Sequence, residues 1–415
     1  MSESSSRIFV RNQRLNQQDF TNQKEITSLS SAFGGQGADF IIAGAGCAGL
    51  SLAVHLINSG KFNDKKIIIV DKQSKNKNDR TWCFWEKEDD LFQSVVHKQW
   101  DHLFVQDETK QLSLNIAPYK YKLIRGIDFY NYCFKILNNH PNVNWVQADI
   151  QNMFSDQSGT GIVFNNNKVY AKYVFNSLMP EKFSLKKNDY WMLQHFKGWF
   201  IKTEEDCFDP DAATLMDFDT DQTEGTAFFY ALPFSTKNAL IEYTLFSKDQ
   251  LDDVVYEAAL KNYVEKKLRI IKYIVEEKEF GIIPMTNHAF SKSNHNIINI
   301  GTAGGQTKGS SGYTFKFIQK HSKAITDSLI QYGNPFSAQT FSSRFRFYDS
   351  VLLYILSKKQ LKGSEIFMRM FQKNKPQQVL KFLDNETSPL EDLAVISTLP
   401  TLPFAKAAKD HLLQK

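Results

Sequence analysis

The stretch Asp39-Phe40-Ile41-Ile42-Ala43-Gly44-Ala45-Gly46-Cys47-Ala48-Gly49-Leu50 predicts a short buried strand that runs into a glycine turn and then a helix. The turn has the pattern G-x-G-x-x-G. In this pattern Gly44 permits the tight turn, Gly46 lets the backbone approach a pyrophosphate, and Gly49 lets the helix pack closely on the strand. The pattern alone is weak evidence, because a glycine-rich strand-to-helix turn can also bind no ligand. The residues that flank the turn therefore have to indicate whether it binds a nucleotide.

The residues after the turn favour a nucleotide site. Leu50, Ala53, Val54 and Ile57 have the spacing of one helix face. Four apolar residues at 67–70 then predict a second buried strand, which ends at Asp71. An acid at this point is where a dinucleotide-binding unit holds a ribose hydroxyl. The order strand, glycine turn, helix, strand and acid therefore predicts a nucleotide-binding βαβ unit.

A second glycine-rich segment lies far along the chain, again between a predicted strand and a predicted helix. It follows the apolar run 297–300 and reads Gly301-Thr302-Ala303-Gly304-Gly305-Gln306-Thr307-Lys308-Gly309-Ser310-Ser311-Gly312. Backbone N–H groups in such a turn can bind an anion. Two turns of this kind fit one cofactor held from both ends of the chain. Since a nicotinamide domain usually needs only the first turn, the pair favours FAD.

The composition limits the classes of protein to which the chain can belong. A chain of 415 residues can form two structural regions, and a net charge of +5 is too small to argue for a nucleic-acid partner. The aromatic share of 13% suits a large apolar ligand, or simply an aromatic core. The four cysteines show no C-x-x-C pair and no metal-ligand spacing, which predicts buried thiols in a reducing compartment and no metal site. We see no secretory signal and no run of 18 apolar residues, so we expect no spanning helix.

Two arginines are candidates for cofactor contacts. Arg80 begins the aromatic segment Arg80-Thr81-Trp82-Cys83-Phe84-Trp85, shortly after the predicted ribose acid. Its side chain could reach the cofactor while the aromatic rings line a pocket, or the segment could be a satellite hydrophobic cluster. Arg125 stands at the start of a predicted helix, where it could meet a phosphate or a ribityl chain. The alternative for Arg125 is a surface ion pair.

Glu242 is the candidate proton donor. It lies in the apolar strand 240–246, where period two places it on one face with Leu240, Thr244 and Phe246. An ionised carboxyl is costly on an apolar face, so its pKa should rise, which suits an acid catalyst. The alternative is that the odd-numbered residues of the strand face the core and Glu242 faces solvent.

Three further segments have a distinctive composition. Residues 1–36 are polar and predict a disordered N-terminal extension, and residues 253–276 predict a helix. Residues 344–381 carry nine Lys or Arg against two acids, with apolar residues at helical spacing. A basic amphipathic helix of this kind can lie on an anionic membrane surface, or it can pack its apolar face on the protein.

Taken together, these motifs resemble the bacterial-type lycopene beta-cyclases, a family of FAD-dependent carotenoid cyclases. The resemblance covers about residues 39–385. Its segments follow the family's order: the fingerprint at 39–71, DRTWCFW at 79–85, YKLIRGIDFY at 121–130, QHFKGWF at 194–200, TLMDF at 214–218, LIEYTLFS at 240–247, FGIIPMT at 280–286, GTAGGQTKGSSGYTFKFIQ at 301–319 and RFRFYDSVLLYIL at 344–356.

The resemblance implies an α/β fold. Its parts are an FAD-binding Rossmann-like domain of the flavin hydroxylase and geranylgeranyl reductase type, an interleaved antiparallel-sheet substrate domain and a C-terminal helical region. The implied boundaries are residues 37–80, 121–180 and 290–340 for the FAD domain, 81–120 and 181–289 for the substrate domain, and 341–415 for the C-terminal helices.

The resemblance also implies roles for individual residues. The ADP half of FAD is bound by Gly44, Gly46, Gly49 and Asp71. The flavin's phosphate or ribityl part is contacted by Arg80 and Arg125. The pyrophosphate and isoalloxazine side is held by the segment that contains Gly301, Thr302, Gly304 and Gly312. Thr302 stands where many relatives in the wider fold have an acid. Glu242 matches the family's motif carboxylate, which is proposed to be an acid.

The implied reaction closes a beta-ionone ring at each end of lycopene, giving gamma-carotene and then beta-carotene. It is an isomerisation that needs reduced FAD, with NAD(P)H as the reductant, and either Glu242 or the flavin delivers the proton. Because lycopene lies in the bilayer, we expect a cytoplasmic enzyme that associates peripherally with the membrane. The alternatives are an FAD-dependent reductase or monooxygenase of isoprenoids or aromatics, and a non-catalytic flavin-binding protein at the membrane.

Overall fold

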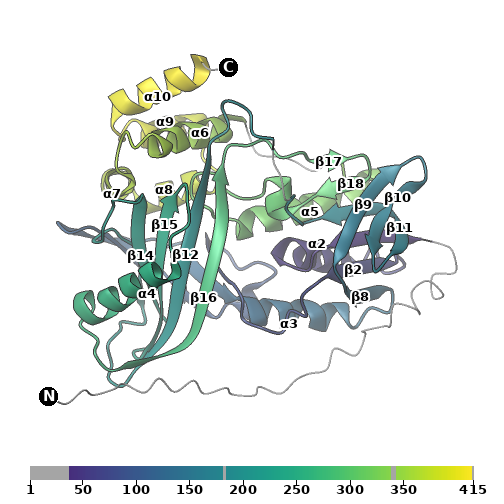
Figure 1. Cartoon of the computed structure of the whole chain (residues 1–415), viewed down its shortest axis with the longest axis horizontal. Helices are drawn as coiled ribbons and strands as arrows, with labels where there is room; N and C mark the ends of the chain where they lie inside the picture. The colour runs from purple at the N-terminus through teal and green to yellow at the C-terminus, as the bar shows by residue number, and fades with distance from the viewer. Residues whose placement is uncertain (1–36, 181–183, 338–342, 414–415) are drawn as a thin grey trace.

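The computed structural model describes residues 37–180, 184–337 and 343–413, so the predicted extension 1–36 lies outside the described residues. Figure 1 shows two lobes side by side, with the C-terminal helices stacked at one end of the lobe that contains the long strands. The first lobe carries the glycine fingerprint. The second contains the strand with Glu242.

The first lobe is built on a sheet whose core strands are parallel. Within the described residues the order is β17-β18-β11-β1-β2-β8, and the β9–β10 hairpin pairs with β11. The strands are β1 (Ala38–Ala43), β2 (Ile67–Asp71), β8 (Val143–Gln147), β9 (Ile150–Asp156), β10 (Gly159–Phe164), β11 (Asn167–Asn176), β17 (Ser293–Asn294) and β18 (Ile297–Asn299).

Both faces of this sheet are covered, which explains why its strands read as unbroken apolar runs. One face packs on α2 (Cys47–Asn58), α3 (Gly126–Leu137) and α5 (Phe315–Tyr332), with Ile42 and Ile69 among the buried residues. The other face buries Ile41 and Ile68 beneath the β9–β10 hairpin. The predicted βαβ unit is therefore confirmed.

The second lobe is a large sheet with the order β16-β12-β15-β14-β13-β5-β6 in the described chain. All its pairs are antiparallel except β13 with β5. Its strands are β5 (His102–Gln106), β6 (Gln111–Asn115), β12 (Trp191–Thr203), β13 (Ala212–Asp217), β14 (Thr226–Pro233), β15 (Asn238–Ser247) and β16 (Tyr273–Thr286).

The two faces of the large sheet pack against different partners. One face packs on α4 (Asp253–Asn262) and buries Ile241, Tyr243 and Leu245. The other face buries Leu240 and Phe246 against C-terminal helices. The predicted helix 253–276 is wrong beyond its first part, because α4 ends at Asn262, a π-helical turn follows at Tyr263–Lys267, and β16 begins at Tyr273.

A small sheet joins the lobes. It has the order β3-β7-β4 and consists of β3 (Thr81–Glu86), β4 (Lys98–Trp100) and β7 (Lys120–Arg125). Successive side chains of β3 point to opposite lobes, as a strand requires. Trp82 and Phe84 pack in the core of the first lobe, whereas Trp85 packs in the core of the second. The predicted aromatic segment therefore forms part of both cores.

The C-terminal helices, yellow and light green in Figure 1, cover one face of the large sheet. They are α6 (Ser343–Ser357), α7 (Gly363–Lys373), α8 (Pro376–Leu383), α9 (Pro389–Ile396) and α10 (Thr401–Leu413). Phe345 and Ile355 of α6 are buried in this core, so the apolar side of the basic region packs on the protein. Among the described helices, none combines the length and apolar character needed to cross a membrane.

Candidate active site: a glycine groove beside a buried carboxyl pair

The first glycine turn is shaped for a close approach of backbone to ligand. Gly44 has φ +99, and a Cβ there would lie 2.2 Å from Oγ of Ser177. A Cβ on Gly49 would lie 1.9 Å from the carbonyl oxygen of Gly44, so helix and turn touch directly. Gly46 differs, because apart from Gly46 and its two chain neighbours no described atom lies within 4 Å of the position that its Cβ would take. The space over Gly46 is open at the N-terminus of α2, where no side chain caps the helix.

Asp71 ends β2, as predicted, and fixes the glycine turn. One of its oxygens accepts a hydrogen bond from the backbone N–H of Ala45 at 2.7 Å. The same oxygen lies 3.2 Å from Nζ of Lys75, which is buried. No local sequence pattern pointed to Lys75. Its position places a cation beside the acid that is predicted to hold the ribose.

The second glycine segment closes onto the first. Gly301 has φ +61, and a Cβ there would lie 2.7 Å from the Cβ of Ala48 in the first turn of α2. The segment continues as a 3₁₀ turn, η3 (Gly301–Gly304). Gly312 has φ +73 and leaves room for the side chain of Gln194, whose Oε1 would lie 2.1 Å from a Cβ on this glycine. The structure thus brings the two glycine segments together.

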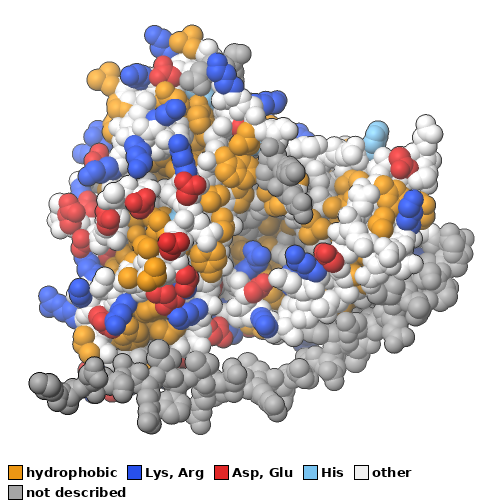
Figure 2. Space-filling view, viewed as in Figure 1, with side chains coloured by type: hydrophobic (Ala, Val, Ile, Leu, Met, Phe, Trp, Pro, Cys, Tyr) orange, Lys and Arg blue, Asp and Glu red, His pale blue; other side chains and the backbone are white. Residues whose placement is uncertain are grey.

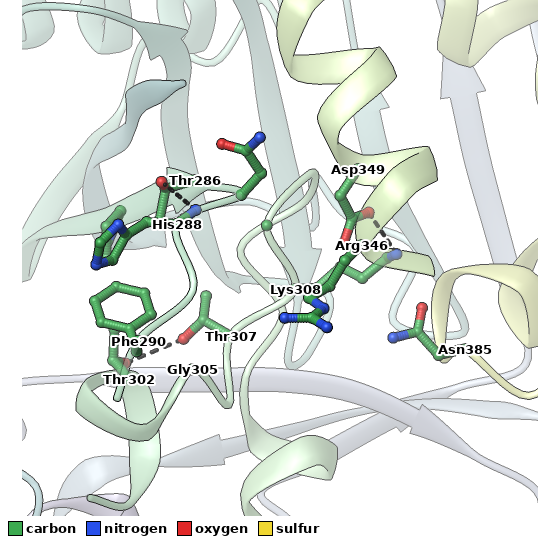
Figure 3. A pocket seen from close by; sticks show the side chains of 13 residues that line it. Thr286, His288, Phe290, Thr302, Gly305, Thr307, Lys308, Arg346, Asp349 and Asn385 are labelled. Atoms are coloured by element: carbon green, nitrogen blue, oxygen red, sulfur yellow. Dashed lines mark hydrogen bonds and ion pairs between the residues drawn. The ribbon is translucent and has the colours of Figure 1, made fainter. Parts of the chain in front are cut away.

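A pocket opens beside the second glycine segment (Figure 3). It encloses about 550 Å³ of empty space, including its mouth. Thr302 lines it and shares a hydrogen bond with Thr307 at 3.1 Å. On the opposite side Lys308 pairs with Asp349 at 2.6 Å, whereas the guanidinium of Arg346 makes no hydrogen bond or ion pair with the described residues. Arg346 is therefore an uncommitted cation at the border of the predicted cofactor loop.

The two predicted arginines differ in their surroundings. Arg80 is exposed, and its nearest acid is Asp79 at 3.8 Å. Its charge also acts on the thiol of Cys47 in the first turn of α2. Arg125 is held by Asp128 through two hydrogen bonds of 2.6 and 3.0 Å. Arg80 therefore remains available to a ligand, whereas Arg125 forms the ion pair that was its alternative interpretation.

Glu242 lies on the face of β15 that points to the interior between sheet and C-terminal helices, with Leu240 and Phe246. The odd-numbered residues of the strand do face a core, which α4 covers, as the alternative expected. Glu242 is half-buried on the opposite face, so it does not project into open solvent. A second carboxyl, Glu279, lies close by. Glu242 and Glu279 both pair in register with Gly198 of β12, one from each side, so the three residues form one row across three strands.

A threonine hydroxyl donates to each carboxyl. Thr244 Oγ1 donates to Glu242 Oε1 at 2.8 Å, and Thr81 Oγ1 donates to Glu279 Oε2 at 2.7 Å. Burial, followed by the charge of Glu279, raises the pKa of Glu242 well above its usual value. Burial also raises the pKa of Glu279 to about 7, although the bond from Thr81 opposes this rise. The site can therefore hold a neutral carboxyl at neutral pH.

Aromatic rings surround the carboxyls on the side of the small sheet. Tyr230 of β14 pairs in register with Glu242. Tyr313, just before α5, contacts Trp85 edge-on with centroids 4.5 Å apart, and its hydroxyl lies 3.5 Å from that of Tyr121. The charge of Glu242 acts on both Tyr230 and Tyr313. Since Tyr313 follows the second glycine segment, it links the glycine groove to the carboxyl pair.

Glu242 was predicted from the sequence, whereas Glu279, Thr81 and Gly198 were not recognised as parts of the same site. A signal for Glu279 was present, because period two along β16 puts it on one face with Ile283 and Met285. The position of Thr81 depends on how the small sheet meets the large one. No local pattern contains that information.

Comparison of the fold with solved structures shows the class of protein to which the chain is similar. Solved structures that resemble the chain include a geranylgeranyl bacteriochlorophyll reductase-like protein from Thermoplasma acidophilum (13% identity, 91% of this chain and 97% of that chain covered, TM-score 0.54). A flavoprotein/dehydrogenase from Cytophaga hutchinsonii is also similar (10% identity, 91% and 99% covered, TM-score 0.60). So is CtdE, solved with FAD and a substrate (12% identity, 91% and 100% covered, TM-score 0.54). The chain therefore has the fold of FAD-dependent flavoproteins, as predicted.

The family is more specific than the fold. A family model described as "Lycopene cyclase protein" matches residues 39–409. The chain belongs to the lycopene cyclase family, which confirms the resemblance found in the sequence. No curated protein matches the chain significantly.

Proposed function

We propose that the protein is an FAD-dependent lycopene beta-cyclase, an isomerase that converts the open ends of lycopene into beta-ionone rings, through gamma-carotene to beta-carotene. The observation that carries the proposal is Glu242, a half-buried carboxyl with a raised pKa on the same strand face as the apolar Leu240 and Phe246. Membership of the lycopene cyclase family supports the same assignment.

The residues present fit FAD. The open space over Gly46 and the uncapped N-terminus of α2 suit a pyrophosphate, since N–H groups and the helix dipole favour an anion there. The contact of Gly301 with Ala48 puts the second glycine segment at the same helix end. In its reduced, anionic form FAD would supply negative charge that stabilises a carbocation beside it. We propose NAD(P)H as the source of the reducing electrons.

In the proposed reaction the protein donates one proton to the substrate for each ring, and one proton leaves the substrate again. An alkene is a poor base, so the donor must be a neutral acid that is close and shielded from water. The Glu242 carboxyl gives its proton to the terminal double bond, which leaves a tertiary carbocation. The neighbouring double bond attacks this cation and closes the ring, and the Glu242 carboxylate takes back a ring proton, which forms the new double bond and restores the acid. The faces of Tyr230, Tyr313 and Trp85 would favour the cation.

The substrate sets where the enzyme works. Lycopene is a long hydrocarbon that lies within the bilayer, so we propose a cytoplasmic protein that docks on the membrane surface. Figure 2 shows hydrophobic and basic side chains next to one another over the C-terminal helices, at the top of the view. On α9 and α10 the exposed large apolar residues are Leu390, Leu393, Leu402, Leu412 and Leu413. The exposed Lys406 and Lys409 of α10 add positive charge that suits anionic lipid.

The experiment is expression in a host that accumulates lycopene, followed by separation of the pigments. We expect gamma-carotene and beta-carotene from the wild type, and lycopene alone from Glu242→Gln with its FAD still bound. The matched control is Glu276→Gln, which neutralises an exposed acid of β16. Unchanged lycopene with the wild type would contradict the proposal. Consumption of NAD(P)H in step with product would show a redox enzyme instead.

A further inference from the structure

We propose that Glu279 is a second functional carboxyl of this site, and that Glu242 and Glu279 hold one proton between them over Gly198. The inference rests on the proposed function, since it assigns Glu279 the task of keeping Glu242 protonated for cyclisation. Glu279 is then a positioning residue, which acts on the substrate through Glu242.

Gly198 makes the contact between the carboxyls possible. Residues in register on adjacent strands point to the same face, and neighbouring strands lie about 4.8 Å apart. Glu242 and Glu279 stand on strands separated by β12, so a side chain between them would keep them apart. A Cβ on Gly198 would lie 2.9 Å from Cγ of Glu279 and 3.1 Å from its Oε1. Glu279 therefore leans over the glycine, in the direction of Glu242.

The hydrogen bonds leave one oxygen for a shared proton. Thr81 satisfies Oε2 of Glu279, and Thr244 satisfies Oε1 of Glu242. Oε1 of Glu279 is buried and receives no hydrogen from any group in the described chain. Such an oxygen is costly in an apolar interior. A proton on one of the two carboxyls supplies the missing bond, because a protonated carboxyl donates and its partner accepts.

The surrounding groups disfavour two negative charges here. The titratable groups that interact with the pair are Glu277 of β16, Cys83 of β3, Tyr230 of β14 and Tyr313 before α5. None of these is a cation. Like charges held close together in a low dielectric cannot both ionise easily, so the pair retains a proton at a pH where isolated carboxyls have lost theirs.

The test is the pH dependence of cyclisation. Glu279→Gln removes the charge that opposes ionisation of Glu242, so we expect the alkaline limb of the rate profile to move to lower pH. If the limb moves down by one pH unit, the cyclisation rate of the variant at a fixed pH above the limb should be about tenfold lower than that of the wild type. The matched control Glu276→Gln should keep the wild-type profile. Identical profiles for Glu279→Gln and the wild type would overturn the proposal.

Thr81→Val gives an independent variant that keeps both carboxyls. It removes the hydrogen bond that favours ionised Glu279, so the alkaline limb should move to higher pH, opposite to Glu279→Gln. A general loss of structure would not shift the two profiles in opposite directions. An unshifted limb, or a shift to lower pH, would contradict the sharing of a proton.

A readout without substrate separates this proposal from the proposed function. Infrared difference spectra record the carbonyl band of protonated carboxyls. In the wild type we expect a band that persists above neutral pH and that titrates at lower pH in Glu279→Gln. Comparison with the variant isolates the pair from Asp384, another buried carboxyl whose pKa is raised to about 7. If the wild type lacks cyclase activity but shows this behaviour, the proposed function fails and the proton-sharing pair stands. If the band titrates at the same pH in the wild type and in Glu279→Gln, the proposal that the two carboxyls share a proton is wrong.

Discussion

Gly301 packs directly on Ala48, so that a Cβ on the glycine would lie 2.7 Å from the Cβ of the alanine. The two residues belong to glycine segments that lie far apart in the sequence, and their contact makes one groove from both. Because Gly301 also has φ +61, no other residue fits there without strain. The groove thus depends on long-range packing as much as on the glycine pattern itself.

Gly46→Ala should abolish or strongly weaken FAD binding without destabilising the protein. The backbone of Gly46 has φ −80, and no described atom lies within 4 Å of the added methyl. The methyl would meet only the ligand, so we expect at least about a tenfold loss of affinity with a change in unfolding free energy within about 0.5 kcal/mol. Flavin titration and urea unfolding of the apoprotein measure the two effects.

Two other glycines serve as controls for Gly46. Gly301→Ala should lower both FAD affinity and stability, because it adds a clash and backbone strain. Gly60→Ala has the same strain, with φ +67, but no described atom within 4 Å of the added Cβ. It should lower stability by about 1 kcal/mol and leave FAD affinity unchanged. Normal FAD affinity in Gly46→Ala would argue against a pyrophosphate at the helix end.

Gly198→Ala should reduce cyclisation while the protein still binds FAD. The methyl would press on Cγ of Glu279 and on Leu240, each 2.9 Å away, and would separate the two carboxyls. Overpacking of this kind costs about 1–3 kcal/mol of stability. The product yield and the unfolding free energy are the measurements. Wild-type yield would show that the close approach of the carboxyls has no part in activity.

Stability should fall as pH rises through the neutral range. The folded-state pKa of Glu279 is about 7, against an ordinary value of 4.5, so the native protein holds a proton that the unfolded chain releases. The resulting stabilisation is complete below about pH 4.5 and is lost as pH rises through about 7. Urea unfolding of the apoprotein at about pH 5 and about pH 8 would measure the loss.

Glu279→Gln separates this effect from other buried groups. Glu242 and Asp384 also have raised pKa values and contribute a fall in stability in the same direction, so every single variant should retain part of the wild-type pH dependence. We expect a smaller fall in stability for Glu279→Gln than for the wild type. An equal fall in both proteins would mean that Glu279 is ionised in the native state at neutral pH.

Local patterns predicted what a single strand or turn determines. The βαβ unit follows from the spacing of apolar residues and is confirmed. The same kind of spacing placed Glu242 on one face with Leu240 and Phe246 but left open whether that face meets solvent, and the structure shows it half-buried there. The cofactor roles of Asp71 and Arg80 stay predictions, although the structure places both residues beside the first glycine turn. Glu279 could be recognised as a partner of Glu242 only after the register of β12, β15 and β16 was known, because register links residues that lie far apart in sequence.

Tertiary contacts overrode two local patterns. The helix predicted over 253–276 stops early, where Tyr263 stacks on Phe229 with centroids 4.0 Å apart and donates to Asp217. The basic stretch 344–381 has the pattern of a membrane-surface helix, yet the apolar side of α6 is buried in the core. Its Arg344 pairs with the buried Asp392 of α9. Periodicity predicts that a face is apolar but does not identify what covers it.

The exposed leucines of α10 should contribute to membrane binding. Leu402 is 83% exposed and Leu413 is 73% exposed, so neither supports the fold. Since burial of a leucine in an apolar phase contributes about 1.5–3 kcal/mol, replacing both with serine should weaken binding to anionic vesicles by at least about tenfold. Vesicle sedimentation measures this binding, and high salt should weaken the binding of the wild type because it screens Lys406 and Lys409.

Val254→Ser, at a 71% exposed position of α4, is the matched control and should bind like the wild type. Equal binding of the double variant and the wild type, or binding that salt does not change, would mean that another surface meets the membrane.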